Sequence, residues 1–125
     1  FLIRNLLGAD QTTGAVAVGE VVQEGQTVQF QLRDAVSASQ EFNALLAADH
    51  ARHRHPPLGA LMFSCCGRGQ GLFGKPNHDA GTASARLGAI PLAGFFAQGE
   101  IGPIGGRNFL HGYTASLALF SERDS

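Results

Sequence analysis

Charged residues and tryptophan are scarce in this sequence. Charged side chains make up 15% of its 125 residues, tryptophan is absent, and Lys75 is the only lysine. A disordered chain would be rich in charge and poor in apolar residues, whereas hydrophobic residues reach 44% here, so disorder is excluded. The formal net charge of −1 provides no strong field for nucleic acid or an anionic membrane, so we expect neither as a partner.

Cysteine is also rare, and the two cysteines, Cys65 and Cys66, are neighbours. A disulfide between neighbours closes almost no loop, so a disulfide-stabilised secreted domain is excluded and a reducing, cytoplasmic location is expected. No apolar run reaches the length of a membrane span. The sequence opens with Phe1-Leu2-Ile3-Arg4 rather than methionine, which we interpret as the start of a domain within a longer protein.

The first half of the chain has the pattern of a hairpin followed by a helix. Small and β-branched residues alternate over residues 14–19, residues 19–24 follow, and apolar and polar residues alternate over residues 27–33, which predicts a half-buried antiparallel hairpin. Ser37 and Gln40 have the spacing of a capping box, so we expect the helix to begin at Ser37. It should fray through residues 50–55 and end before Pro56.

The second half predicts a sheet with a further helix. The apolar run 58–63 is typical of a buried central strand, and residues 77–87 predict a helix ended by Gly88. Further strands are expected at 90–96, 99–104 and 113–120, the last two paired through a turn at Gly105-Gly106. We therefore expect one α/β domain over residues 1–125, with α+β as the alternative: a mixed, largely antiparallel sheet and about two packed helices.

The loop from Ser64 to Gly74 is the strongest candidate site. It follows the carboxyl end of the predicted central strand, where ligands bind in open α/β sheets. Backbone N–H groups of Gly67, Gly69 and Gly71 could surround a carboxylate or another anion. Arg68 could add a bidentate contact. The alternative is that the glycines only permit a tight loop and Arg68 is solvated.

Cofactor and metal chemistry are weakly supported. Gly69, Gly71 and Gly74 match the G-x-G-x-x-G spacing of a dinucleotide site, but the first acid after the next predicted strand, Glu100, is 31 positions after Gly69 instead of roughly 20. His50 and His53 could share a helical face, yet no set of four metal ligands accompanies them. We expect no cofactor and no bound metal.

The two cysteines leave a thiol-dependent reaction open. Adjacent residues of a strand point to opposite faces, so one of Cys65 and Cys66 is expected in the core and the other toward the loop. A thiolate near Arg68 and His78 would be reactive, but no orienting acid other than Asp79 is evident. Catalysis is therefore the less favoured interpretation.

A second group of candidate residues lies on or beside the last predicted hairpin. It consists of Glu100, Asn108, His111 and Tyr113. Glu100 lies among glycines and apolar residues, and a buried carboxylate there needs a partner. Arg68 or Arg107 would make this a structural ion pair, whereas a ligand would make it a binding group.

Several motifs in order resemble the FIST C-terminal domain family. The specific pieces are Phe63-Ser-Cys-Cys-Gly-Arg-Gly69 and Gly99-Glu-Ile-Gly-Pro103, and the others are Phe73-Gly74, Asn77-His-Asp79, Pro91-Leu-Ala-Gly-Phe-Phe96 and Asn108-Phe-Leu-His-Gly112. The resemblance extends to the hairpin residues Phe1–Asn5 and Gly25–Phe30, so it covers nearly the whole chain. It implies an intracellular ligand-sensing module of signal transduction, with amino acids or related metabolites as ligands. It also implies a FIST N-terminal domain as companion, and it carries over no catalytic residue.

The expected function is therefore that of a sensory domain rather than an enzyme. Its ligand would be a small polar metabolite whose carboxylate meets the Gly67–Gly71 amides and Arg68. The ligand's ammonium or hydroxyl end would meet Glu100, Asn108 or Tyr113. The alternatives are a protein-interaction or dimerisation module without a ligand, and a thiol-dependent enzyme. No residue pattern identifies the signalling partner.

Overall fold

A computed structural model describes residues 2–53 and 55–122 of the chain. Helices and mostly antiparallel strands combine in it, so the expected mixed fold is confirmed in its α+β form. The chain divides into two compact units, Phe1–Leu32 and Arg33–Ser125. Among the described residues, no helix has the length and apolar character needed to span a membrane.

The first unit is a short antiparallel hairpin of β1 (Leu6–Ala9) and β2 (Val16–Val18). Its turn is closed by the Asp10 carboxylate, which accepts hydrogen bonds from the Thr12 backbone N–H (2.9 Å) and the Thr13 hydroxyl (2.7 Å). The strand expected at residues 27–33 is not formed, and that prediction is wrong. Val28, Phe30 and Leu32 are 64%, 73% and 94% exposed, because no described strand pairs with this segment to make a face that could be buried.

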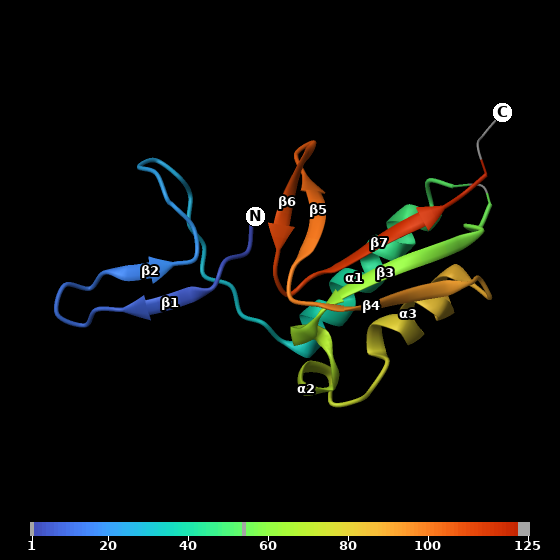
Figure 1. Cartoon of the computed structure of the whole chain (residues 1–125), viewed down its shortest axis with the longest axis horizontal. Helices are drawn as coiled ribbons and strands as arrows, with labels where there is room; N and C mark the ends of the chain where they lie inside the picture. The colour runs from blue at the N-terminus through green and yellow to red at the C-terminus, as the bar shows by residue number, and fades with distance from the viewer. Residues whose placement is uncertain (1, 54, 123–125) are drawn as a thin grey trace. The chain divides into compact units, whose positions relative to one another are not determined.

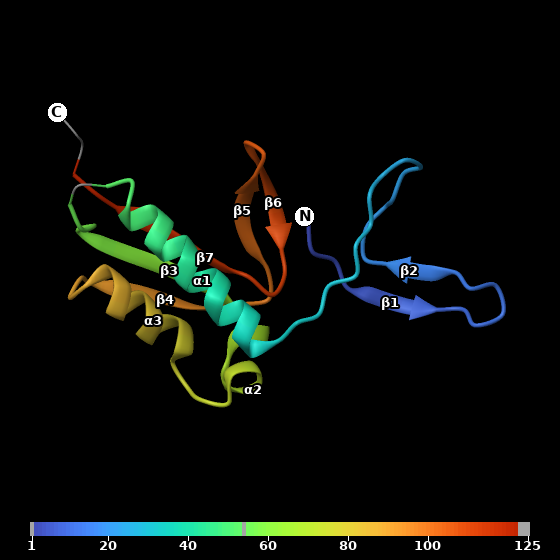
Figure 2. The same cartoon turned by 180° about the vertical axis from the view of Figure 1, so that it is seen from behind.

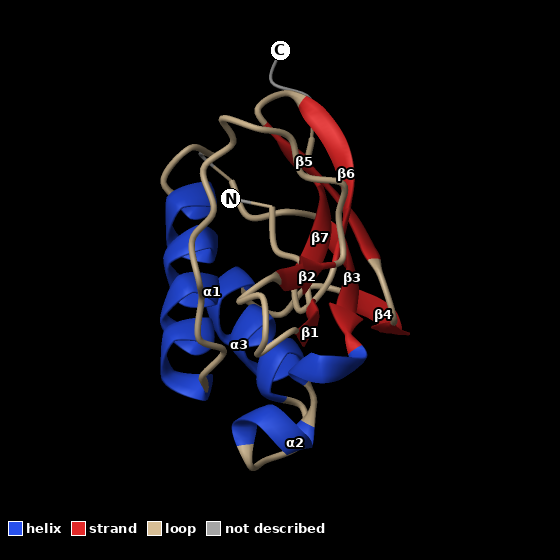
Figure 3. Cartoon of the chain, turned by 90° about the vertical axis from the view of Figure 1, so that its left-hand side faces the viewer, coloured by secondary structure: helices blue, strands red, loops and turns tan. Residues whose placement is uncertain are grey.

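The second unit is a three-stranded sheet with two helices on one face. Its strand order is β4 (Leu92–Ala97), β3 (Gly59–Cys65) and β7 (Ala115–Phe120). Strand β3 is central, parallel to β4 and antiparallel to β7, as its continuous apolar run predicts. Helices α1 (Ala35–His50) and α3 (His78–Leu87) cover the sheet (Figure 1 and, from behind, Figure 2), and Figure 3 shows them on one side of it.

The core forms where these helices meet β3. Its buried members are Phe42, Leu46, Ala60, Ala83 and Leu87. Phe42 and Leu46 lie one turn apart on α1, as do Ala83 and Leu87 on α3, so each helix presents a single apolar stripe to the sheet.

Helix α1 begins earlier than its sequence pattern predicts. Asp34 rather than Ser37 is the N-cap, and the Asp34 carboxylate accepts a hydrogen bond from the Ser37 backbone N–H at 2.8 Å. Asp34 and Ser37 both favour the N-cap position, so the capping-box pattern predicts a helix start three residues too late. The earlier start places Ser39 inside the helix, next to the site described below.

The last part of the chain contains a strand that was not expected. Gly105 and Gly106, with φ of 56° and 78°, connect β5 (Glu100–Ile104) to β6 (Arg107–His111), and β7 pairs with β3 instead of β5. A two-residue turn with both central φ values positive favours immediate strand pairing, which explains why β6 follows the glycines directly. Between β3 and α3 lie a 3-10 turn (Cys66–Arg68) and the short helix α2 (Gln70–Phe73).

Gly94 in β4 provides a test of the β3–β4 pairing. A Cβ at this position would collide with the Met62 carbonyl of β3, whereas a Cβ at Gly81 in α3 would meet nothing within 4 Å. We expect Gly94→Ala to lower the free energy of unfolding by at least about 1–3 kcal/mol. Gly81→Ala, the matched control, should raise it by about 0.5–1 kcal/mol because alanine favours the helix. Urea unfolding measures both, and a neutral Gly94→Ala would contradict the pairing.

Candidate functional site

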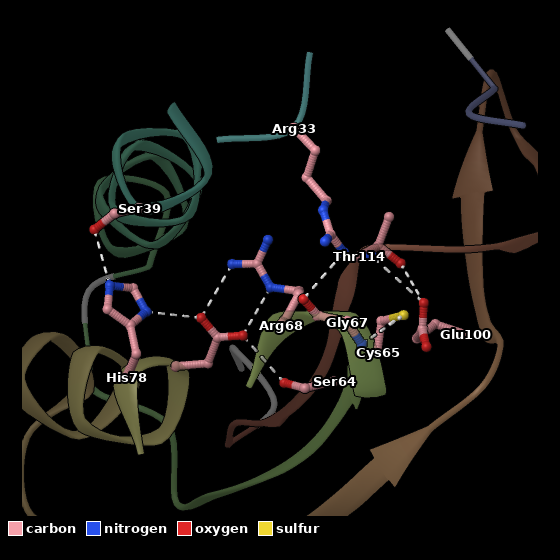
Figure 4. Close-up of polar contacts among 10 residues, drawn as sticks. Arg33, Ser39, Ser64, Cys65, Gly67, Arg68, His78, Glu100 and Thr114 are labelled. Carbon is pink, nitrogen blue, oxygen red and sulfur yellow. Dashed lines mark hydrogen bonds and ion pairs between the residues drawn. The ribbon is translucent and has the colours of Figure 1, made fainter. Parts of the chain in front are cut away.

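A buried ion pair joins the end of β3 to the start of α3. The Arg68 guanidinium donates from Nε to Asp79 Oδ2 at 2.7 Å and from Nη2 to Asp79 Oδ1 at 3.0 Å (Figure 4). The two side chains are only 7% and 4% exposed. Arg68 is thus not solvated: Asp79 accepts from its Nε and from Nη2, which leaves Nη1 without a hydrogen-bond partner among the described residues.

Three further side chains surround Asp79. Ser64 Oγ donates to Oδ2 at 3.3 Å, and His78 Nδ1 donates to Oδ1 at 3.0 Å. His78 Nε2 lies 3.0 Å from Ser39 Oγ of α1 (Figure 4), and the Phe73 ring stacks on the imidazole at a centroid distance of 3.6 Å. We call Ser39, Ser64, Arg68, His78 and Asp79 the Asp79 network. It links both helices to the end of the central strand.

The Asp79 network keeps its carboxylate ionised. Burial alone raises the pKa of Asp79, but the hydrogen bonds from Arg68 and His78, together with their positive charge, outweigh it and leave the pKa below its ordinary value of 3.8. A charged Asp79 in turn keeps Arg68 paired in an environment that would otherwise penalise the cation.

Ser39, His78 and Asp79 have the connectivity of a Ser-His-Asp relay, with the carboxylate on Nδ1 and the hydroxyl on Nε2. Ser39 is the fifth residue of α1, however, so its backbone N–H belongs to the helix ladder and does not face a developing oxyanion. The same contacts use both His78 nitrogens, which leaves the cysteines without a histidine base. The arrangement therefore favours a structural role for His78.

A cleft of about 590 Å³ adjoins the Asp79 network, and we call it the Arg68 cleft. It is lined by Met62, Ser64, Arg68, Gly69, Gln70, Pro76, Asn77, His78, Asp79, Ala80 and residues 92–96. Three of the predicted site residues, Ser64, Arg68 and Gly69, lie in this lining. Its walls come from β3, β4 and the start of α3, so the cleft lies beside the loop that was expected to hold a ligand.

A second cluster forms around Glu100, and we call Cys65, Gly67, Glu100, Tyr113 and Thr114 the Glu100 corner. Glu100 is 1% exposed, and its Oε2 accepts from Thr114 Oγ1 at 2.9 Å and from the Thr114 N–H at 3.4 Å. Its Oε1 is buried and has no hydrogen-bond partner among the described residues. The structural alternative, an ion pair with Arg68 or Arg107, is not formed, since Arg68 is bound to Asp79 and Arg107 lies over the Phe109 ring.

Gly67 is in the Glu100 corner for a steric reason. A Cβ there would lie 2.7 Å from Arg33 Nη1 and 2.8 Å from Tyr113 Cδ1. Arg33 donates to the Gly67 carbonyl at 3.3 Å and lies 4.6 Å over the Tyr113 ring, while Tyr113 itself has a positive φ of 62°. The Gly67 N–H contacts Cys65 Sγ at 3.4 Å, so one of the three amides expected to bind an anion is already engaged.

The other predicted site residues are dispersed. His111 pairs with Glu100 across the β5–β6 ladder and contacts the Gly102 carbonyl at 2.9 Å through Nε2. Cys66, Gly71 and Asn108 are exposed, and none of the three lines the Arg68 cleft. Cys65 is buried, as expected for one member of the cysteine pair. Gly67 lies beside Tyr113 in the Glu100 corner, whereas Arg68 and Gly69 line the Arg68 cleft, so the structure divides the residues predicted to bind the carboxylate between the two places.

Sequence reasoning missed the central role of Asp79, although a signal was present. Asp79 is the only acid between Asp49 and Glu100, and it lies eleven residues after Arg68, the arginine of the candidate loop. Ser39 carried no signal, because its contact to His78 depends on how α1 packs against α3.

Comparison with known proteins finds a family model and several relatives that match this chain. A family model described as FIST C domain matches residues 1–103. An uncharacterised protein of Mycobacterium tuberculosis (strain H37Rv) is 58% identical over 120 residues, and one of Mycobacterium bovis is 56% identical over the same length. Each alignment covers 96% of this chain and 31% of the relative, so the chain spans about a third of the length of these proteins. No solved structure matches the chain.

The Asp79 network predicts how stability depends on pH. Because the pKa of Asp79 is lower in the folded protein, the unfolded chain takes up the proton first, so this stabilisation is present above pH 3.8 and is lost as the pH falls through the folded pKa. Asp79→Asn should lower the free energy of unfolding at neutral pH by about 3–5 kcal/mol and flatten the acid slope. Asp49 of α1 is partly exposed and lies 3.6 Å from His53, so Asp49→Asn is the control and should change the free energy of unfolding by less than about 1 kcal/mol. An unchanged acid slope in Asp79→Asn would contradict the assignment.

The Glu100 corner predicts an unusual response to charge removal. Glu100→Gln keeps the acceptor for Thr114 and removes a carboxylate that has no cationic partner among the described residues, so the free energy of unfolding should fall by less than about 1 kcal/mol. Thr114→Val removes the hydroxyl donor and leaves the buried Oε2 with only the longer contact from the Thr114 N–H, so it should cost about 1–3 kcal/mol. Thermal unfolding measures the loss of stability in each variant. A loss of stability in Glu100→Gln much larger than the one expected would reveal a charged partner.

Proposed function

Because this chain belongs to the FIST C domain family, we propose that it is a sensory domain that binds a small carboxylate metabolite in the Arg68 cleft. The single observation that carries the proposal is a cleft of about 590 Å³ next to a buried, fixed guanidinium. Pockets for small ligands are concave, mostly apolar and provided with a few oriented polar groups.

The Asp79 network supports the proposal by fixing Arg68 before a ligand arrives. Two contacts to Asp79 hold the guanidinium plane, and Arg68 lies 5.7 Å from the Phe42 ring and 5.4 Å from the Phe73 ring. A side chain that is already ordered loses little further entropy on binding, so the contact to a ligand is stronger. The remaining nitrogen, Nη1, has no hydrogen-bond partner among the described residues and is the group through which Arg68 would bind a carboxylate.

The Asp79 network also supports coupling of the ligand to the rest of a signalling protein. A ligand on Arg68 would act on Asp79, and through His78 on Ser39 of α1. We propose a cytoplasmic setting and a FIST N-terminal domain as the companion within longer relatives.

The exposed aromatic residues Phe95 and Phe96 on strand β4 favour a second candidate function, that of a dimerisation module. This candidate predicts a doubled mass in solution that Phe95→Ser abolishes.

Filling the Arg68 cleft tests the proposal. Ala80 of α3 lines the cleft, whereas Ala44 of α1 is exposed and does not. In a thermal-shift screen of amino acids and organic acids, a ligand of the wild-type chain should raise the melting temperature, and Ala80→Leu should abolish that shift. Ala44→Leu is the matched control and should keep it. A shift that survives in Ala80→Leu, or a screen with no shift at all, would contradict binding in this cleft.

A further inference from the structure

The polar groups of the Arg68 cleft restrict the chemistry of its ligand. Asp79 is the only acid in the lining, and each of its oxygens already accepts two hydrogen bonds. Oδ1 receives Arg68 Nη2 and His78 Nδ1, while Oδ2 receives Arg68 Nε and Ser64 Oγ. A carboxylate offers about four such positions, so Asp79 has none left for a ligand ammonium.

The second acid that could have met an ammonium lies elsewhere. Glu100 belongs to the Glu100 corner, is 1% exposed and does not line the cleft. An amino group brought into the cleft would lose water without gaining an anionic partner, which is costly for a charged group. The one charged donor with an unused position is Arg68 Nη1, and it favours an anion.

The remaining lining is largely apolar. Met62 comes from β3, Leu92 and Phe96 from β4, Ala80 from α3, and Pro76 from the segment just before α3. Phe96 is 57% exposed, so a ligand that covered it would remove apolar surface from water. A short polar acid would leave this wall uncovered.

We propose that the ligand of the Arg68 cleft is a monocarboxylate with an apolar body and without an ammonium group, such as an aryl- or branched alkyl-substituted acid. This inference rests on the proposed function and makes it more specific: the carboxylate binds Arg68 Nη1, and the body packs on the wall of β4. It replaces the expectation that an amino acid binds through both ends.

Matched ligands test the inference without altering the protein. 3-Phenylpropionate and L-phenylalanine differ only in the ammonium group, as do 4-methylpentanoate and L-leucine. 3-Phenylpropionamide lacks the negative charge, and succinate lacks the apolar body. Calorimetric titration of the wild-type chain should show each monocarboxylate binding at least about tenfold more tightly than its amino acid, the amide or succinate. Ala80→Leu should abolish that binding, and Ala44→Leu should retain it.

The outcomes separate this inference from the proposed function. Amino acids binding as tightly as their deaminated counterparts, or succinate binding best, with sensitivity to Ala80→Leu, would overturn the inference and leave the proposed function in place. The same holds if none of these compounds binds while the wider screen finds another ligand sensitive to Ala80→Leu. If neither experiment finds binding that Ala80→Leu abolishes, both fail. Tight monocarboxylate binding that resists Ala80→Leu would move the site out of the cleft and overturn both.

Discussion

The ion pair between Arg68 and Asp79 is the interaction on which the second unit depends most. Both charges are almost fully removed from water, a cost that is offset only when the geometry is good and every remaining polar position is satisfied. The two bonds to Arg68 and the contacts from Ser64 and His78 meet that condition for the Asp79 carboxylate, whereas Arg68 Nη1 has no partner among the described residues. The pair therefore demands that β3, the 3-10 turn and α3 be placed correctly together, and it provides specificity as well as stability.

Much of the second unit could be predicted from local patterns. The apolar run that forms β3, the helix that ends at Gly88 and the strand that contains Phe95 were all expected close to where they occur. In each of these segments, the spacing of apolar residues is typical of a single type of secondary structure and of a single degree of burial. Residues 27–33 show the limit of this reasoning: their alternation is that of a strand, but alternation does not provide the neighbouring strand that pairing requires.

The candidate site could be predicted in its members but not in its pairings. Arg68 is singled out by its place among the glycines and thiols of the loop, and Glu100 by the rule that a carboxylate in apolar surroundings needs a partner; both are buried. Which acid meets which base depends on how β3, α3 and β5 are arranged in space. The same limit applies to Gly67. The density of glycines in its loop suggested anion binding, but the close approach of Arg33 and Tyr113 explains why this position has no side chain.

Tyr113, the residue of the Glu100 corner with a positive φ, determines the intrinsic fluorescence of the chain. Tyr113 is the only tyrosine, and the sequence contains no tryptophan, so the near-ultraviolet emission of the protein comes from this one ring. The Arg33 guanidinium lies 4.6 Å over that ring, and the neighbouring Thr114 donates to Glu100. The protein thus carries an intrinsic fluorophore at the Glu100 corner and outside the lining of the Arg68 cleft, and its emission distinguishes events at these two places without any label.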